Sequence, residues 1–203
     1  MESDEVRQHW ATREGKYSPE YYADIGPNEV SRTLADILDH YVDQNAAILE
    51  IGCGSGRHLE HLRRQGFRNL AGIDINEEAF DVMAQYYPNL FDSGEFESGA
   101  VEQLLPTIED DAFDVVYSVE TLQHIPPEET DCFEELPRIT RDLLITAENE
   151  GNGPNRGRTD YTFVQDEFPL FYRDWKGIFS DLGMAQLLRE PTNRDTIRVF
   201  RTL

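Results

Sequence analysis

The stretch that decides the fold is Ile48-Leu49-Glu50-Ile51-Gly52-Cys53-Gly54-Ser55-Gly56-Arg57-His58-Leu59. It begins with a short apolar run, continues through a turn with three glycines, and ends where a helical pattern starts. Glycine adopts positive φ without strain and lets a ligand come close to the backbone. The stretch therefore predicts a buried strand, a ligand-binding turn and a helix, in that order.

The same alternation of strands and helices continues on both sides of this stretch. The predicted strands are Ala46–Ile51, Asn69–Asp74, Glu95–Ser98, Phe113–Val119, Asp142–Ala147, Met184–Arg189 and Thr196–Arg201. The predicted helices are Val30–Val42, Arg57–Gln65, Glu77–Tyr87, Glu128–Ile139 and Tyr172–Leu182. The connections are long enough for parallel crossovers. The sequence therefore predicts an α/β fold with seven strands.

The composition excludes several classes of protein. The chain has 203 residues, enough for about one domain, and its 18 basic against 40 acidic side chains give a formal net charge of −22. This charge argues against nucleic acids and anionic membranes as partners. Only Lys16 and Lys176 are lysines, and an acidic, lysine-poor surface is what we expect of a halophilic host. An acidic protein from an ordinary host is the alternative.

The cysteines and the N-terminus indicate a cytoplasmic protein. Cys53 and Cys132 are far apart and have no metal-like spacing, so we expect neither a disulfide framework nor a metal site. The segment Met1–Trp10 is charged and lacks the apolar core of a signal peptide. No apolar stretch approaches the length that crosses a bilayer.

The glycine turn and the next strand end point to one kind of ligand. A dinucleotide fingerprint needs a further glycine where this chain has Arg57 or Leu59, and Glu50 adds negative charge beside the turn. A cationic ligand therefore suits the turn better than a pyrophosphate. Asp74 ends the second predicted strand, where a carboxylate accepts hydrogen bonds from ribose hydroxyls. Taken alone, an aspartate at this position is more often a helix N-cap than a ribose ligand.

Three blocks in this order resemble the class I S-adenosylmethionine-dependent methyltransferases: Glu50–Gly56, Gly72–Asp74 and Phe113–Ser118. The resemblance runs from about Val30 to the C-terminus. It implies a Rossmann-like, seven-stranded, mostly parallel sheet with helices on both faces and a C-terminal antiparallel strand. It also implies a methyltransferase domain over residues 30–203, with residues 1–29 as an N-terminal cap segment. A plain helix over one sheet edge is the alternative for that segment.

The resemblance also assigns the cofactor, S-adenosyl-L-methionine, and its site. The residues that it places at the cofactor are Glu50, Gly52, Cys53, Gly54, Gly56, Asp74, Ile75, Val101, Glu102 and Ser118. Asp74 would bind the ribose and Ile75 would pack on the adenine. Ala100 stands where the family often has an acid for the adenine amino group, which leaves Val101 and Glu102 as candidates.

Two residues are candidates for the base that would deprotonate a methyl acceptor. His124 follows the fourth predicted strand and Glu148 ends the fifth, so both stand at the carboxyl edge of the sheet. His9, Tyr17 and Tyr21 are weaker candidates. The Gln-His-Ile context of His124 is also common in the family without a catalytic role. No metal is required for this reaction.

The acceptor is predicted to be a small molecule. The segments Phe168–Trp175 and Ile125–Glu128 resemble methyltransferases of sugar pathways, which suggests a hydroxyl or carboxyl of a sugar or glycan precursor. Arg156, Arg158 and Arg173 would then hold a carboxylate or phosphate, unless they pair with the many acids. A noncatalytic cofactor-binding module and an NAD-dependent oxidoreductase remain as alternatives, and the oligomeric state stays open.

Overall fold

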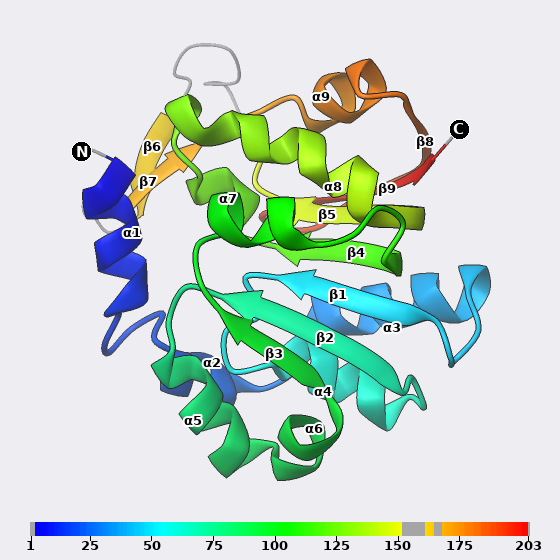
Figure 1. Ribbon diagram of the computed structural model, residues 1–203. Coiled ribbons are helices and arrows are strands. Elements are labelled where there is room, and N and C mark those ends of the chain that lie inside the picture. The colour runs from blue at the N-terminus through cyan, green and yellow to red at the C-terminus, as the bar shows by residue number, and fades with distance from the viewer. Residues whose placement is uncertain (1–2, 152–160, 165–167, 203) are drawn as a thin grey trace.

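The computed structural model describes residues 3–151, 161–164 and 168–202, and it is built on one seven-stranded sheet (Figure 1). The strand order is β3-β2-β1-β4-β5-β9-β8. The strands are β1 (Ala47–Ile51), β2 (Asn69–Asp74), β3 (Glu95–Ser98), β4 (Phe113–Val119), β5 (Thr140–Glu148), β8 (Met184–Pro191) and β9 (Thr196–Thr202). Strands β1 to β5 are parallel, whereas β9 is antiparallel to both of its neighbours. The expected mostly parallel sheet with a C-terminal antiparallel strand is confirmed.

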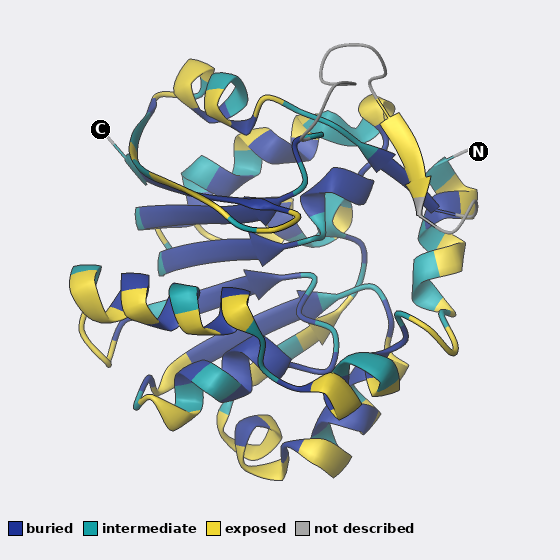
Figure 2. Cartoon of the chain, turned by 180° about the vertical axis from the view of Figure 1, so that it is seen from behind, coloured by how far each residue is buried: buried dark blue, intermediate teal, exposed yellow. Residues whose placement is uncertain are grey.

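Helices cover both faces of the sheet and bury two separate apolar cores. One face packs against α3 (Glu29–Tyr41), α4 (Arg57–Arg64), α5 (Glu78–Tyr86) and α6 (Pro88–Ser93). The other packs against α8 (Glu135–Ile139) and α9 (Trp175–Asp181). Successive side chains of β1 alternate between the cores, with Ile48 in the first and Leu49 and Ile51 in the second. Figure 2 shows the central strands buried along most of their length.

The region after β4 differs from the sequence prediction. Instead of one helix over Glu128–Ile139, the chain forms the 3₁₀-helix η3 (Pro127–Glu134) followed by the short α8. Pro137 lacks a backbone N–H and its ring would clash with the carbonyl four residues earlier, so a continuous α-helix is disfavoured. Three more short helices connect the strands: α7 (Val101–Leu104), η1 (Leu105–Thr107) and η2 (Leu122–His124).

A second, two-stranded sheet was not expected from the sequence. It pairs β6 (Tyr161–Val164) antiparallel with β7 (Phe168–Phe171), and Phe168 and Leu170 of β7 are buried. The helix expected over Tyr172–Leu182 begins later, as α9, because Asp174 caps it by accepting a hydrogen bond from the Gly177 N–H at 3.1 Å. The hairpin therefore lies where no element was predicted, and α9 occupies only part of the predicted helix.

The first residues form α1 (Ser3–Ala11) and α2 (Pro19–Ile25). In Figure 1, α1 stands beside the ends toward which the arrows of β1, β2 and β3 point, and not along an outer strand of the sheet. Val6, Arg7 and Trp10 of α1 line a cavity at those ends. No helix of the described residues is both long and apolar enough to span a bilayer.

Candidate cofactor and active site

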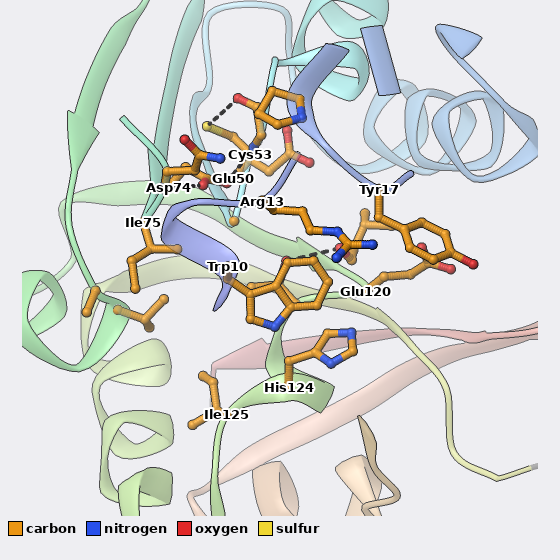
Figure 3. Close-up of a pocket in the computed structure, with 18 of the residues that line it drawn as sticks. Trp10, Arg13, Tyr17, Glu50, Cys53, Asp74, Ile75, Glu120, His124 and Ile125 are labelled. Atoms are coloured by element: carbon orange, nitrogen blue, oxygen red, sulfur yellow. Dashed lines mark hydrogen bonds between the residues drawn. The ribbon is translucent and has the colours of Figure 1, made fainter. Parts of the chain in front are cut away.

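A cavity opens at the carboxyl ends of the parallel strands, where the strand order reverses between β1 and β4. Such switch points are where open α/β sheets bind their ligands. The segments that follow β1, β2, β3 and β4, the β8–β9 turn and the N-terminal segment with α1 and α2 form its wall. The lining includes Glu50, Gly52–Ser55, Arg57, His58, Asp74–Asn76, Ala100–Glu102, Val119–Thr121, His124–Pro126, Glu129 and Arg194, with Val6, Arg7, Trp10, Arg13, Tyr17, Pro19 and Tyr22 from the cap (Figure 3).

The three glycines of the turn after β1 differ in what surrounds them. A Cβ on Gly52 would come 2.2 Å from Thr121 Oγ1, and a Cβ on Gly56 would come 2.8 Å from Leu90 Cδ2, so both positions are closed by protein atoms. Gly54 has φ +51°, and a Cβ there would meet nothing within 4 Å. Gly56 does not belong to the described cavity lining. Gly54 is therefore the glycine that leaves room for a ligand, while Gly52 and Gly56 allow the turn to pack.

Asp74 joins the ends of β1 and β2. Its Oδ2 accepts a hydrogen bond from the Gly54 N–H at 2.6 Å, and its Oδ1 accepts one from the Asn76 N–H at 2.8 Å. Burial raises the pKa of Asp74, and the backbone donors oppose that rise. Each carboxylate oxygen retains a second lone pair, so the group can hold the turn and still accept hydrogen bonds from a ribose.

Two further residues of the turn region are buried beside the cavity. Glu50 is only 1% exposed, accepts a hydrogen bond from the Tyr117 hydroxyl at 2.9 Å, and has a pKa raised well above its usual range by burial. Burial likewise raises the pKa of the Cys53 thiol, with Asp74 and Glu50 adding to the effect. Cys53 is therefore a protonated thiol at neutral pH and no nucleophile.

The part of the cavity wall beyond Asp74 is where the sequence predicts the adenine ring to bind. Ile75, Ala100 and Val101 give this part of the wall an apolar surface. Glu102 also lines it, but its carboxylate accepts from Arg7 of α1, which also bonds to Glu129 and Asp4. The Glu102 side chain thus connects the sheet to the cap, and an adenine amino group would have to share it with Arg7.

His124 lies on the acceptor side of the cavity, facing Trp10 of the cap (Figure 3). The two ring centroids are 4.7 Å apart. His124 Nδ1 is 2.8 Å from the Pro169 carbonyl oxygen, which can only accept, so Nδ1 carries the proton and Nε2 the lone pair. Burial lowers the pKa of His124 to about 4. His124 is therefore neutral at pH 7 and a weak base.

Glu148 does not line the cavity, in contrast to its expected role as a base. Its carboxylate accepts from the Ser118 hydroxyl and from the backbone N–H groups of Thr121, Leu122 and Gln123 at 3.2–3.3 Å. Burial raises the pKa of Glu148 to about 7. Ser118 is equally buried and lies outside the cavity lining. The pair supports the turn after β4 and does not belong to the described cavity lining.

The remaining candidates from the sequence divide in the same way. Tyr17 lines the cavity, whereas His9 and Tyr21 are not part of its described lining. Arg173 donates to the carbonyl oxygens of Leu122, at 3.0 Å, and Ile125, so it holds the same turn, and it is not part of the described cavity lining. Arg156 and Arg158 lie outside the described residues.

Several lining residues were not assigned a role from the sequence. Glu120 has φ +51° and pairs with Arg194 of the β8–β9 turn at 3.1 Å. Tyr17 is also held at positive φ, +69°. Non-glycine residues with positive φ cluster at functional sites, and both of these lie in the wall of the cavity. No local sequence signal marks Arg194 or Trp10, because both enter the cavity through tertiary packing.

The cavity fits S-adenosylmethionine. Gly54 leaves room at the turn, and Asp74 presents acceptor atoms for a ribose. Glu50 lines the same space, which suits a ligand that carries cationic groups. Within the described ranges, no three His, Cys, Asp or Glu side chains are grouped to hold a metal ion.

Comparison with known proteins gives the same assignment. Residues 48–142, just under half of the chain, match the model of a family described as a methyltransferase domain. Over 123 residues the chain is 28% identical to the ubiquinone biosynthesis O-methyltransferase of Nitrosococcus oceani, covering 61% of this chain and 49% of that protein. It is 33% identical to EEF1A lysine methyltransferase 2 of Danio rerio over 87 residues, 38% of this chain and 36% of that protein. The chain thus spans half or less of these relatives' length.

Solved structures extend the likeness to the whole fold. Magnesium protoporphyrin IX methyltransferase from Synechocystis PCC 6803, with bound SAH, superposes with a TM-score of 0.74 at 16% identity over 100% of both chains. The 1,6-didemethyltoxoflavin-N1-methyltransferase of Burkholderia thailandensis gives a TM-score of 0.66 at 16% identity, covering 86% of this chain and 78% of that one. Residues 48–142 are thus similar to a methyltransferase domain, and the chain has the fold of solved methyltransferases that bind SAM or SAH.

Proposed function

We propose that the chain transfers the methyl group of S-adenosylmethionine to a small-molecule acceptor. One observation carries the proposal: the Gly54–Asp74 corner, which suits the adenosyl group, opens into the same cavity as Trp10, Tyr17 and His124. The two cap helices contribute to the wall of this cavity, which restricts its mouth. A covered cavity suits a small acceptor better than a folded polymer, and the net charge of −22 disfavours RNA.

Positioning is the main contribution that this site can make. The cofactor supplies an electrophilic methyl group on a sulfonium, and displacement requires the acceptor atom in line with it. Holding two reactants in such an orientation lowers a barrier by roughly 7–11 kcal/mol at best. The Gly54 turn and Asp74 would hold the cofactor, while Trp10 and Tyr17 would orient the acceptor from the cap.

The acceptor should need little help in losing its proton. His124, with a pKa of about 4, is the lining histidine nearest the Trp10 ring but takes up a proton weakly at neutral pH. An acceptor carboxylate or an acidic hydroxyl needs no strong base, so we favour these groups over an alkyl hydroxyl or an ammonium. The sugar or glycan precursor stays a prediction, since Arg173 is bonded to backbone carbonyls.

Calorimetry with S-adenosylhomocysteine and NADH tests the proposal. We expect the first to bind and the second not to bind. Asp74→Ala should weaken S-adenosylhomocysteine by about 1.5–3 kcal/mol through lost charged hydrogen bonds, whereas Asp81→Ala, an exposed position on α5, should leave it unchanged. Binding of NADH alone would overturn the assignment in favour of an oxidoreductase. Binding of cofactor without turnover on a panel of carboxylic and hydroxylic acceptors would favour a noncatalytic module.

The cap segment of residues 1–29, the methyltransferase domain of residues 30–203 and the cytoplasmic location belong to the same proposal. The cap is supported by the contribution of α1 and α2 to the cavity wall. The halophilic host is supported by the charge and by the two lysines. Unfolding measured against KCl concentration tests the host, and full stability in dilute buffer would contradict it.

A further inference from the structure

Arg57 is a buried cation that forms no ion pair with an acid among the residues that the structure describes. It is the first residue of α4, is 9% exposed and lines the cavity. Its Nε donates a hydrogen bond to His58 Nε2 at 3.2 Å, and its guanidinium carbon lies 4.5 Å from the ring centroid of Tyr22. No hydrogen bond or ion pair among the described residues involves its two terminal nitrogens. Buried arginines are normally paired with an anion, so this guanidinium lacks a partner.

The other cations around the cavity differ in this respect. Arg7 bonds to Asp4, Glu102 and Glu129, and Arg194 pairs with Glu120. Arg57 acts electrostatically on Glu50 and opposes the rise of its pKa, but no ion pair joins the two described side chains, and burial still raises the pKa of Glu50 well above its usual range. At neutral pH, Arg57 therefore presents a positive charge to the cavity without a facing carboxylate in contact.

The side chain is held by a chain of hydrogen bonds whose direction is fixed by chemistry. Arginine can only donate, so His58 Nε2 must accept and His58 Nδ1 must carry the proton. His58 Nδ1 then donates to Ser31 Oγ at 2.8 Å. Ser31 Oγ also accepts from the Asn28 N–H and can donate to Asn28 Oδ1 at 3.3 Å, which is the capping box of α3. The neutral, Nδ1-protonated histidine thus joins Arg57 to the N-terminus of α3.

The position of Arg57 matches one particular part of the cofactor. The adenosyl end is assigned to Asp74, Ile75 and Val101, so the remaining amino-acid tail must extend past the Gly54 turn along the rest of the wall. Glu50 and Arg57 lie on that part of the wall, before and after the turn. An acid and a separate guanidinium on the same wall suit the α-amino and α-carboxylate groups of a zwitterion.

We propose, on the basis of the proposed function, that Arg57 binds the α-carboxylate of the cofactor and that His58 and Ser31 are positioning residues that orient its guanidinium beforehand. Tyr22 restrains the same group from the cap, so cofactor and cap meet at one side chain. The two terminal N–H groups of a guanidinium match a carboxylate in bidentate geometry, which a lysine at this position would not reproduce.

Two ligands separate this role from general damage to the site. S-adenosylhomocysteine has the carboxylate, and its decarboxylated analogue S-adenosyl-3-thiopropylamine lacks only that group. Calorimetry should show that Arg57→Met lowers the affinity for S-adenosylhomocysteine about 10- to 100-fold. The affinity for the decarboxylated analogue should change less than about 3-fold. Arg64→Met is the matched control: it removes an arginine of the same helix that is 60% exposed and pairs with Glu60, and neither affinity should change.

The positioning role of His58 is tested by comparing a variant that keeps a hydrogen-bond acceptor for Arg57 with one that has none. His58→Gln offers an oxygen that can accept from Arg57 Nε, so it should keep most of the affinity for S-adenosylhomocysteine. The leucine in His58→Leu cannot accept a hydrogen bond, so this variant should bind S-adenosylhomocysteine about 5- to 10-fold more weakly. Its affinity for the decarboxylated analogue should not change. If His58→Leu fails to fold, Ser31→Ala, which releases His58 Nδ1, replaces it and should give a smaller selective loss.

The outcomes distinguish the two proposals. If the unmodified protein binds neither ligand, the proposed function fails and this inference fails with it. If it binds both, and Arg57→Met weakens both equally or neither, Arg57 does not bind the carboxylate although the cofactor assignment stands. If His58→Leu and His58→Gln behave alike, the histidine has no positioning role.

Discussion

The two ends of the cavity are built on different principles. At the cofactor end, the backbone of the Gly54 turn and the Asp74 carboxylate form the wall themselves and bond directly to each other. At the acceptor end, the wall is the turn after β4, and Glu148 and Arg173 hold that turn from behind. A motif that is local in sequence thus gives one end, while the other end depends on contacts between distant segments.

Two glutamates at strand ends show the same difference. Glu50 ends β1 and Glu148 ends β5, and burial raises the pKa of both. Glu50 lines the cavity. Glu148 instead accepts hydrogen bonds from three backbone N–H groups. Leaving a buried N–H group without an acceptor costs about 1–3 kcal/mol of stability. The same residue type at equivalent strand ends therefore faces a ligand in one case and supports a turn in the other.

The largest expected effect separates the packing and binding roles of the glycine turn. Gly52→Val should destabilise the fold by about 3–5 kcal/mol, because its Cβ would come within 2.2 Å of Thr121 Oγ1 at a φ of +70°. Gly54→Ala is the matched change, and it should cost only about 1–2 kcal/mol because its Cβ meets open space. Urea unfolding measures both. Equal losses would mean that the two glycines are not different in kind.

The next effect tests Glu148 through the pH dependence of stability. Because the pKa of Glu148 is about 7 in the folded state and about 4.5 in the unfolded state, the folded protein binds more protons between these values. Glu148 therefore lowers the free energy of unfolding as pH rises from about 4.5 to 7, by about 3 kcal/mol in all. Glu148→Gln should remove that part of the slope.

The measurement is urea unfolding at several pH values, with the variant curve subtracted from the wild-type curve. Subtraction is needed because burial also raises the pKa of Glu50 and of Asp74, which contribute slopes of the same sign. Ser118→Ala is a useful companion, since it removes one hydrogen bond to the carboxylate and leaves the titrating group in place. Parallel curves for wild type and Glu148→Gln would show that Glu148 does not titrate in this range.

The smallest expected effect concerns the connection between cap and sheet. Arg7→Met removes the contacts of α1 with Glu102 and Glu129, and partly exposed ion pairs contribute up to about 1 kcal/mol. Amide exchange within α1 should become about 5-fold faster, while global stability changes little. Arg63→Met, which removes an ion pair within α4, should leave α1 unchanged. Unaltered exchange in α1 would show that packing of Val6 and Trp10 alone holds the cap.

The sequence predicted the bounds of the central strands far better than the structure of the segments after β4 and β5. Strands β2 and β4 were predicted with their observed bounds, because buried parallel strands are short apolar runs that end at turn residues. The bounds of β3 were also predicted, although its residues are mostly polar and exposed. The stretch Glu128–Ile139 has a helical apolar pattern, yet Pro137 and the 3₁₀ geometry of η3 decide its structure. The β6–β7 hairpin was missed because its pairing lies between segments without a tight-turn signal.

The sequence by itself determined the sheet, the glycine turn and the carboxylate at the end of β2, since each depends on a few neighbouring residues and their backbone preferences. Only the tertiary structure decided that Trp10, Glu120 and Arg194 enter the cavity and that Glu148 and Ser118 stay behind it. It alone also decided that Arg57 has no ion-pair partner in the described part of the chain. The physical reason is that burial and hydrogen-bond pairing between distant segments are properties of the packed chain, and no local pattern encodes them.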